Sequence, residues 1–254
     1  MNRKNNQEEK SQLIFGIRPL IEALNSGKEI EKVFIQIGLK SENFSELKHL
    51  LNKSGIPLQY VPLEKLNRIT TKNHQGIIAF AAPITFRNIE EIIPEIYEQG
   101  KQPLIMILDR ITDVRNFGAI VRTAECAGVH AIVIPSRGSA LINADALKTS
   151  AGALFKVPVC RAENLKTTIE FLKESGLSIV ACTEKTDEVY YKINYNQPVA
   201  IIMGSEEDGI SGEYLKRSDH KAKIPLMSSI NSLNVSVAAG IILFETVKQR
   251  LKVT

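Results

Sequence analysis

Five residues in three short stretches of this sequence carry side chains that could do chemistry together. The stretches are residues 116–124 (NFGAIVRTA), residues 201–210 (IIMGSEEDGI) and residues 224–240 (IPLMSSINSLNVSVAAG). The side chains are those of Asn116, Arg122, Glu206, Ser232 and Asn234. A cation, a carboxylate and neutral hydrogen-bonding groups suit the orientation of a phosphate-bearing substrate and a cationic cofactor better than they suit hydrolysis.

Several other kinds of catalytic site have no counterpart in the sequence. We find no Gly-rich dinucleotide fingerprint, no GxxxxGK(S/T) phosphate loop, no Ser nucleophile elbow and no Cys/His pair suited to catalysis. The cysteines, Cys126, Cys160 and Cys182, are odd in number and widely spaced, and the four histidines show no ligand spacing. We therefore expect buried, reduced thiols and no metal site.

The second part of the chain, residues 103–254, contains the elements that must position these side chains. Apolar runs occur at residues 104–108, 131–134, 178–182, 199–203 and 222–226, and helical patterns at residues 117–127, 144–154, 165–174 and from Ser232 onward. Continuous apolar strands separated by helices predict a parallel sheet covered on both faces. Ligands of such sheets bind at the carboxyl ends of the strands, where all three stretches begin.

Each candidate residue also has a purely structural interpretation. Ser232 and Asn234 could cap a core helix, because the residues that follow are apolar around most of a helix and predict a buried one. Asn116 could be the N-cap of the helix that carries Arg122. Glu206 could be a solvated loop acid, and Arg122 could form an exposed ion pair with Glu125.

The first part of the chain reads as a smaller α/β domain over residues 13–82. Apolar runs at residues 33–37, 58–61 and 77–82 predict strands, and residues 19–24, 44–51 and 62–68 predict helices. Residues 1–12 are polar and read as a disordered tail. Residues 83–102, rich in Pro, Gly and Glu, read as a linker with one helix that Pro94 kinks or breaks.

Charge distribution separates the two domains. The net charge is +4, and residues 1–82 hold 12 Lys and Arg against 8 Glu, whereas residues 83–254 hold 20 basic and 20 acidic residues. The excess in the first third is compatible with polyanion binding or with an ordinary solvated surface. No apolar run is long enough for a membrane span and no signal peptide is visible, so we expect a cytoplasmic protein.

The three stretches resemble, in order and spacing, the signature motifs of the SpoU class of the SPOUT superfamily, the AdoMet-dependent RNA ribose 2'-O-methyltransferases. The matching positions are Asn116, Gly118 and Arg122 in the first motif, Gly204, Glu206 and Gly209 in the second, and Ile224, Pro225, Ser232, Leu233 and Asn234 in the third. The similarity continues through residues 125–129 and, with residues 74–76 (HQG), into the first domain. It covers roughly 240 residues, and three ordered motifs are far more specific than any one of them.

The resemblance implies a fold, a cofactor and a reaction. It implies a trefoil-knotted C-terminal domain over residues 103–254 and an RNA substrate-binding domain related to ribosomal protein L30e over residues 13–82. It assigns AdoMet to Gly204, Ile224 and Leu233, and catalysis to Asn116, Arg122, Glu206, Ser232 and Asn234. It also implies a homodimer, and the most similar subgroup methylates a guanosine ribose in 23S rRNA.

Three alternatives and two departures from the motifs accompany this expectation. The substrate could be tRNA, the protein could be an inactive RNA-binding member of the same fold, or the chain could be a small-molecule enzyme on a doubly wound sheet. Leu226 replaces the usual Met, which conserves volume. Ser228 stands where the third motif usually has Gly, which matters only if that position needs a positive φ.

Overall fold

The chain folds into two compact units. The structure is a computed structural model that describes residues 13–41, 44–227 and 232–251. One unit is Met1–Thr85 with Ile142–Ala144, and the other is Phe86–Leu141 with Asp145–Thr254. The expected tail at residues 1–12 and the departure at Ser228 lie outside the described residues.

The first unit is a four-stranded sheet with helices. Its elements are β1 (Leu13–Phe15), α2 (Ile17–Asn25), β2 (Ile30–Gln36), α3 (Phe44–Lys53), β3 (Leu58–Val61), α4 (Leu63–Ile69) and β4 (Ile77–Ala81). The strand order is β1-β4-β2-β3, with β2 and β3 parallel and the other pairs antiparallel. One apolar cluster joins α2 and α3 to the sheet, and another joins α4 to it through Leu66 and Ile69.

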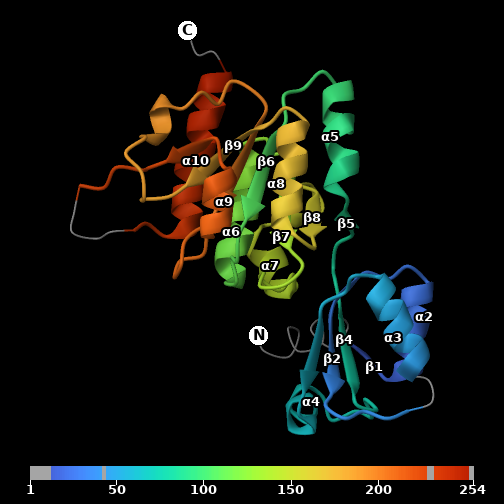
Figure 1. The fold of residues 1–254 in the computed structure, drawn as a ribbon. Coiled ribbons are helices and arrows are strands. Elements are labelled where there is room, and N and C mark those ends of the chain that lie inside the picture. The colour runs from blue at the N-terminus through green and yellow to red at the C-terminus, as the bar shows by residue number, and fades with distance from the viewer. Residues whose placement is uncertain (1–12, 42–43, 228–231, 252–254) are drawn as a thin grey trace. The chain divides into compact units, whose positions relative to one another are not determined.

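The second unit contains a seven-stranded sheet in which every adjacent pair is parallel (Figure 1). The strands are β5 (Phe86–Arg87), β6 (Leu104–Leu108), β7 (Ala131–Pro135), β8 (Val159–Ala162), β9 (Ser178–Cys182), β10 (Val199–Met203) and β11 (His220–Ala222), in the order β11-β9-β10-β6-β7-β8-β5. The helices are α5 (Ile89–Glu98), α6 (Val114–Cys126), α7 (Ala144–Thr149), α8 (Leu165–Glu174), α9 (Gly212–Arg217) and α10 (Val235–Arg250), with 3-10 turns at Ala153–Phe155 and Tyr190–Lys192.

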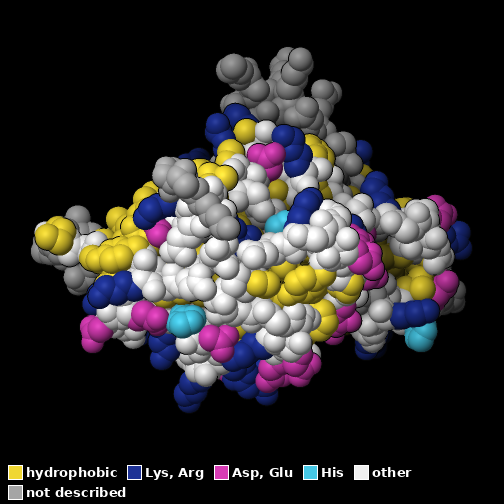
Figure 2. All heavy atoms as spheres, turned by 90° about the horizontal axis from the view of Figure 1, so that it is seen from above, with side chains coloured by type: hydrophobic (Ala, Val, Ile, Leu, Met, Phe, Trp, Pro, Cys, Tyr) yellow, Lys and Arg dark blue, Asp and Glu magenta, His cyan; other side chains and the backbone are white. Residues whose placement is uncertain are grey.

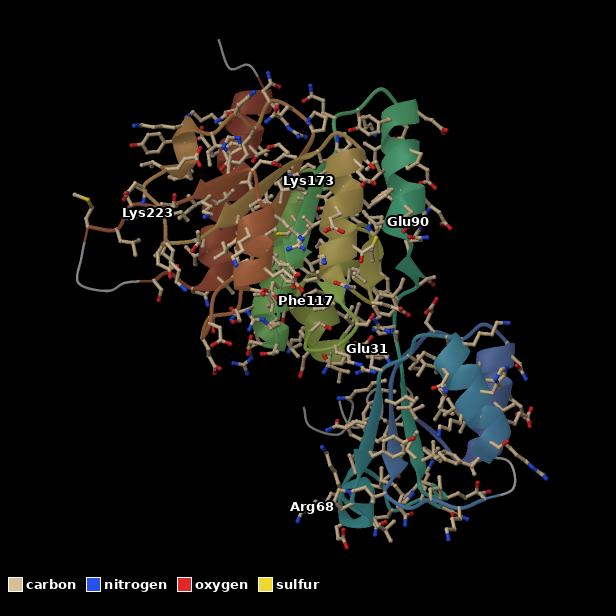
Figure 3. All side chains as sticks on the ribbon, viewed as in Figure 1. Glu31, Arg68, Glu90, Phe117, Lys173 and Lys223 are labelled. Carbon is tan, nitrogen blue, oxygen red and sulfur yellow. The ribbon has the colours of Figure 1, made fainter. Side chains whose placement is uncertain are left out.

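The apolar strands are buried because helices lie against them on both sides. Helices α5, α8 and α9 pack on one face, in a cluster with alternate residues of the strands such as Ile105, Val133 and Ile202. Helices α6 and α10 pack against each other. Phe117, labelled in Figure 3, belongs to α6 and is buried. The α/β fold class with a parallel sheet and a smaller N-terminal unit is thus confirmed, and the knot stays a prediction.

The stretch expected to be a linker differs from that expectation. Residues 86–102 belong to the second unit, where β5 pairs with β8 and α5 runs without a break through Pro94. The reason is the spacing of Ile89, Ile92, Ile93 and Ile96, which puts four buried side chains on one side of the helix. Their burial outweighs the single hydrogen bond that Pro94 removes.

Several other elements also differ in position from those expected from the sequence. The structure adds β5, β8 and α9, and the strand expected at residues 222–226 is β11 at His220–Ala222. Helix α10 begins at Val235, not at Ser232, and it is not buried all round. Val237 and Phe244 are 52% and 50% exposed, because they lie seven residues apart on one side that no described residue covers.

The surface seen from above carries charges of both signs (Figure 2). Lysine and arginine side chains alternate with aspartate and glutamate, and hydrophobic side chains are visible between them. No helix in the described part of the chain is long and apolar enough to cross a membrane.

Candidate active site

The candidate site lies where four parallel strands end. Strands β6, β9, β10 and β11 are neighbours in the sheet, and because they are parallel their carboxyl ends lie on one edge. The first motif follows β6, the second follows β10 and the third follows β11. The topology therefore brings together three segments that are far apart in sequence.

Three of the five expected side chains form one hydrogen-bonded group. Asn116 Nδ2 donates to Glu206 Oε1 at 2.9 Å, and Asn234 Nδ2 donates to the same oxygen at 3.0 Å. Asn234 Nδ2 also donates to Asn116 Oδ1 at 2.9 Å. We call Asn116, Glu206 and Asn234 the polar triad, and it contains one carboxylate held by two amides.

Local structure explains how the two asparagines are oriented. Asn234 is the N-cap of α10, and its Oδ1 accepts from Ser236 N at 3.0 Å and Ser236 Oγ at 2.6 Å, which turns its amide nitrogen toward Glu206. The expectation that Asn116 caps α6 is wrong, because Asp113 is the N-cap and its Oδ1 accepts from Asn116 N at 2.7 Å. The Asn116 side chain is thereby left available to Glu206.

The loop that carries Glu206 is closed at its base. Ser205 and Gly209 exchange two backbone hydrogen bonds, with N···O distances of 3.2 and 3.0 Å. A Cβ on Gly204 would collide with the backbone of Gly209 and Ile210, so only glycine fits this approach. Glu206 therefore lies in a tight, short turn rather than in a loose loop.

A cavity adjoins the polar triad. It has about 690 Å³ of empty space, which includes space open to solvent. Its lining includes Gly204, Glu206, Ile224, Ser232 and Leu233, so Ser232 and the three residues expected to bind the cofactor meet at one cavity.

The cavity lining fits the AdoMet that the resemblance implies. Met203, Ile224, Leu226, Val235 and Ala238 give it an apolar wall, as an adenosine requires. The charged groups that line it are the carboxylates of Glu184 and Glu206, which complement the positive charge of a sulfonium. When bound, AdoMet supplies a methyl group on a cationic sulfur.

Sequence reasoning missed the contribution of β9 to this cavity. Cys182, Thr183 and Glu184 line it, because β9 ends at Cys182 on the same edge of the sheet. The signal was a polar run directly after an apolar strand, as in the three motifs. Cys182 is partly exposed, yet burial of its thiol raises the pKa to about 12, so the thiol is neutral.

Arg122 does not join the polar triad within one chain. It is exposed and does not line the cavity. It makes no hydrogen bond or ion pair with the polar triad or with any other described residue. Its expected partner Glu125 instead bonds Lys156 Nζ at 3.0 Å. Six residues separate Arg122 from Asn116, which is about 240° around the helix, so the two side chains point in different directions.

The described residues contain no group of three His, Cys, Asp or Glu side chains that could hold a metal ion.

Family models match nearly the whole chain. A model described as the SpoU rRNA methylase family matches residues 103–244, and a model described as RNA 2'-O ribose methyltransferase substrate binding matches residues 13–87. The first covers more than half of the chain and all three motifs.

Individual relatives agree with these models. A Bacillus subtilis protein named as a TrmH family tRNA/rRNA methyltransferase is 33% identical over 237 residues, covering 93% of this chain and 95% of its own. The AdoMet-bound structure of an rRNA methyltransferase from Sinorhizobium meliloti has a TM-score of 0.61 at 24% identity, covering 98% of this chain and 91% of that one.

A tRNA-modifying enzyme is also similar. The structure of the A. aeolicus TrmH/SpoU tRNA modifying enzyme has a TM-score of 0.55 at 30% identity, covering 64% of this chain and 84% of that one. With the family-model match and the relatives, the ordered motifs and the cavity they line identify this chain as a member of the SpoU methylase family, the AdoMet-dependent RNA ribose 2'-O-methyltransferases.

Proposed function

We propose that this protein methylates the ribose 2'-hydroxyl of a guanosine in 23S rRNA. The observation that carries the proposal is the polar triad, whose Glu206 lines a cavity with an apolar wall and two carboxylates. Gly204, Ile224 and Leu233 hold the cofactor, Glu206 and Ser232 act on the acceptor ribose beside it, and Asn116 and Asn234 orient Glu206. Positioning supplies much of the rate in such a transfer, because two reactants are held in line.

Within the triad, Glu206 is the group that contacts the acceptor. Its Oε1 already accepts from both asparagines, whereas its Oε2 has no hydrogen bond among the described residues and is available to a ribose hydroxyl. The two amides keep the carboxylate in one orientation, so they act through it. Ser232, on the cavity wall, adds a hydroxyl that can donate or accept.

We propose that Arg122 acts across a homodimer. Gly240 of α10 lies beside Thr123, where an added Cβ would be 3.7 Å from the Thr123 methyl group, and exposed Arg122 is the residue before Thr123. That side carries Val237 and Phe244, which a second copy would cover. Arg122 would then reach the site of the other copy.

The role of Arg122 in this arrangement is electrostatic. A guanidinium stays protonated in proteins, so it holds a phosphate and stabilises the developing 2'-alkoxide rather than accepting the proton. The proton leaves to water or to a phosphate oxygen.

The first unit supports an RNA substrate through one face of its sheet. We define the Lys–Phe face as Lys32, Lys65 and Lys72 with Phe15, Phe34 and Phe80. Two ammonium groups share the Phe34 ring, with Lys32 at 4.8 Å and Lys65 at 4.9 Å from its centroid. Burial lowers the pKa of Lys32, the nearby carboxylate of Glu31 opposes this shift, and the charge of Lys65 adds to it.

The ammonium groups of Lys32 and Lys65 place like charges over the same aromatic ring, and the carboxylate of Glu31 offsets only part of the charge of Lys32. RNA phosphates would relieve that repulsion, and unstacked bases find partners in partly exposed Phe15 and Phe80.

Coverage of the relatives favours rRNA over tRNA. The match to the rRNA methyltransferase of S. meliloti covers 98% of this chain, whereas the match to the A. aeolicus tRNA modifying enzyme covers 64%. An added RNA-binding unit suits a large folded substrate that is recognised by shape and exposed loops.

The function is tested by tritium transfer from labelled AdoMet to unmodified transcripts of 23S rRNA and of tRNA. We expect 2'-O-methylguanosine in the 23S transcript alone. Label in tRNA alone would refute the rRNA assignment. AdoMet binding without transfer to either RNA would favour the inactive RNA-binding alternative.

The Lys–Phe face is tested by RNA affinity at several salt concentrations. Replacing Lys32 and Lys65 with Gln removes two phosphate contacts, so the slope of log K against log salt should fall by about 1.4 to 1.8. The matched control replaces Lys48 and Lys53 of α3, two exposed lysines of the same unit, with Gln. Equal slopes for the two double variants would show that the face has no special role.

A further inference from the structure

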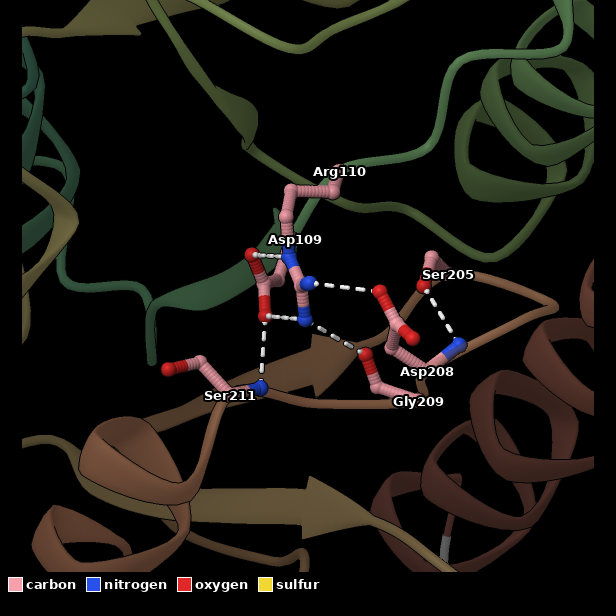
Figure 4. Close-up of polar contacts among 6 residues, drawn as sticks. All are labelled: Asp109, Arg110, Ser205, Asp208, Gly209 and Ser211. Atoms are coloured by element: carbon pink, nitrogen blue, oxygen red, sulfur yellow. Dashed lines mark hydrogen bonds and ion pairs between the residues drawn. The ribbon is translucent and has the colours of Figure 1, made fainter.

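A network beside the site ties the end of β6 to the loop after β10 (Figure 4). The side chain of Asp109 is only 3% exposed. Its Oδ1 accepts from Arg110 Nε at 3.1 Å, and its Oδ2 accepts from Ser211 N at 2.8 Å and from Arg110 Nη2 at 3.3 Å. Both oxygens of a buried carboxylate are thus engaged.

Arg110 extends this network to the loop that carries Glu206. Its Nη1 donates to Asp208 Oδ2 at 3.0 Å, and its Nη2 donates to Gly209 O at 3.1 Å. Asp208 N in turn donates to Ser205 Oγ at 3.1 Å. The guanidinium therefore holds Asp208 and Gly209, which follow Glu206, and Asp208 links it to Ser205, which precedes Glu206.

The backbone of Arg110 indicates that the side chain matters at this position. Its φ is 58°, in the left-handed region, which is strained for a residue with a Cβ. Glycine would adopt this conformation without strain. An arginine at this position is strained, but its guanidinium makes stabilising hydrogen bonds that a glycine could not make.

We propose that Asp109 and Arg110 form a clamp that positions Glu206 in the polar triad and holds the wall of the AdoMet cavity. The inference rests on the proposed function, because it gives Glu206 a role in the reaction. Asp109 and Arg110 are positioning residues: they act through the loop and line no part of the AdoMet cavity themselves. The clamp joins residues about 100 positions apart, between the strand end before Asn116 and the loop of Glu206.

Arg110→Gly separates positioning from stability. Glycine relieves the left-handed strain, but it leaves the buried Asp109 carboxylate without its guanidinium, so Tm should fall and the rate is compared with that of wild type well below Tm. We expect the AdoMet Kd to rise and the single-turnover rate to fall, each about tenfold or more, because both hydrogen bonds from the charged guanidinium to the loop of Glu206 are lost. A residue with a purely structural role would lower Tm in the same way but leave the AdoMet Kd and the rate of the folded enzyme unchanged.

Amide hydrogen exchange measures whether Arg110 holds the loop, and it requires no methyl transfer. In Arg110→Gly, the amides of Asp208 and Ser211 should exchange faster, while those of β6 keep their protection. Arg137→Gly is the matched control: it removes the same charge from an exposed loop arginine that bonds no described residue, and AdoMet affinity should not change.

A double-mutant cycle identifies the partner. Asp208→Asn removes the loop carboxylate that Arg110 contacts. Like Arg110→Gly, this variant should bind AdoMet more weakly and transfer the methyl group more slowly than wild type. Because both changes break one contact, the double variant should be little worse than Arg110→Gly alone. Additive losses would show that the two residues do not act together.

The outcomes decide between the inferences. AdoMet affinity and loop exchange like those of wild type in Arg110→Gly would overturn the clamp, and so would a rate loss that disappears well below Tm. If wild type transfers no methyl group to RNA, the proposed function fails, whereas affinity and exchange still test the clamp.

Discussion

Replacement of Arg122 with Lys should change the rate of methyl transfer and almost nothing else. Arg122 is exposed and bonds no described residue, and Glu125 is engaged by Lys156. Replacing the Arg122 side chain should therefore change the free energy of unfolding by no more than about 0.5 kcal/mol, as for ordinary surface substitutions. Lysine keeps the charge but loses the planar fork that binds a phosphate through two hydrogen bonds.

The expected rate effect is much larger. Losing one preorganised donor that stabilises developing charge lowers kcat about a hundredfold or more, which corresponds to roughly 2.7 kcal/mol in the transition state. This is about five times the expected change in folding free energy. AdoMet affinity should be unchanged, because Arg122 does not line the cavity.

Single-turnover methyl transfer at saturating RNA and AdoMet measures the rate, urea unfolding measures stability and calorimetry measures AdoMet binding. Arg115→Lys is the control, since Arg115 is another exposed arginine on nearly the same side of α6, seven residues earlier. It should stay within a few-fold of wild type. The reasoning is refuted if Arg122→Lys also stays within a few-fold, or if Arg115→Lys is equally slow.

Three further predictions follow from the site and its surroundings. Gly204→Ala should abolish measurable AdoMet binding in calorimetry, because the added Cβ collides with the backbone of Gly209; normal affinity would show that the loop yields. Iodoacetamide at pH 8 should label exposed Cys126 long before Cys160, because burial raises the pKa of the Cys160 thiol to about 12. At pH 8 only about one Cys160 thiol in ten thousand is then the reactive thiolate. Equal labelling rates for the two cysteines would contradict the burial of Cys160. Phe244→Asp should convert a homodimer to a 28.2 kDa monomer in light scattering, because it places a charge on the apolar side of α10, and a wild-type mass of 28.2 kDa would remove the dimer itself.

Much of the site could be predicted from local patterns. The apolar runs before Asn116, Glu206 and Ser232 predict buried parallel strands, and parallel strands end on one edge, so three distant segments had to meet there. Asn234 as the N-cap of α10 is likewise a local property of its sequence and is confirmed. The sequence did not predict the short strands β5 and β8, because two to four residues show too little periodicity to identify a strand.

Other features depend on the tertiary structure alone. Asp113 and Asn116 are both good caps, and the start of α6 at Val114 decides that Asp113 caps and that Asn116 is left to bond Glu206. The same choice, with the packing of α6 on α10, directs Arg122 away from the triad, because a helix changes direction by about 100° at each residue. The clamp of Asp109 and Arg110 on the loop of Glu206 spans about 100 residues, and its partners are set by the order of β6 and β10 in the sheet. Sequence patterns determine which residue types stand at the strand ends, and the packing of helices on the sheet decides which of those side chains meet.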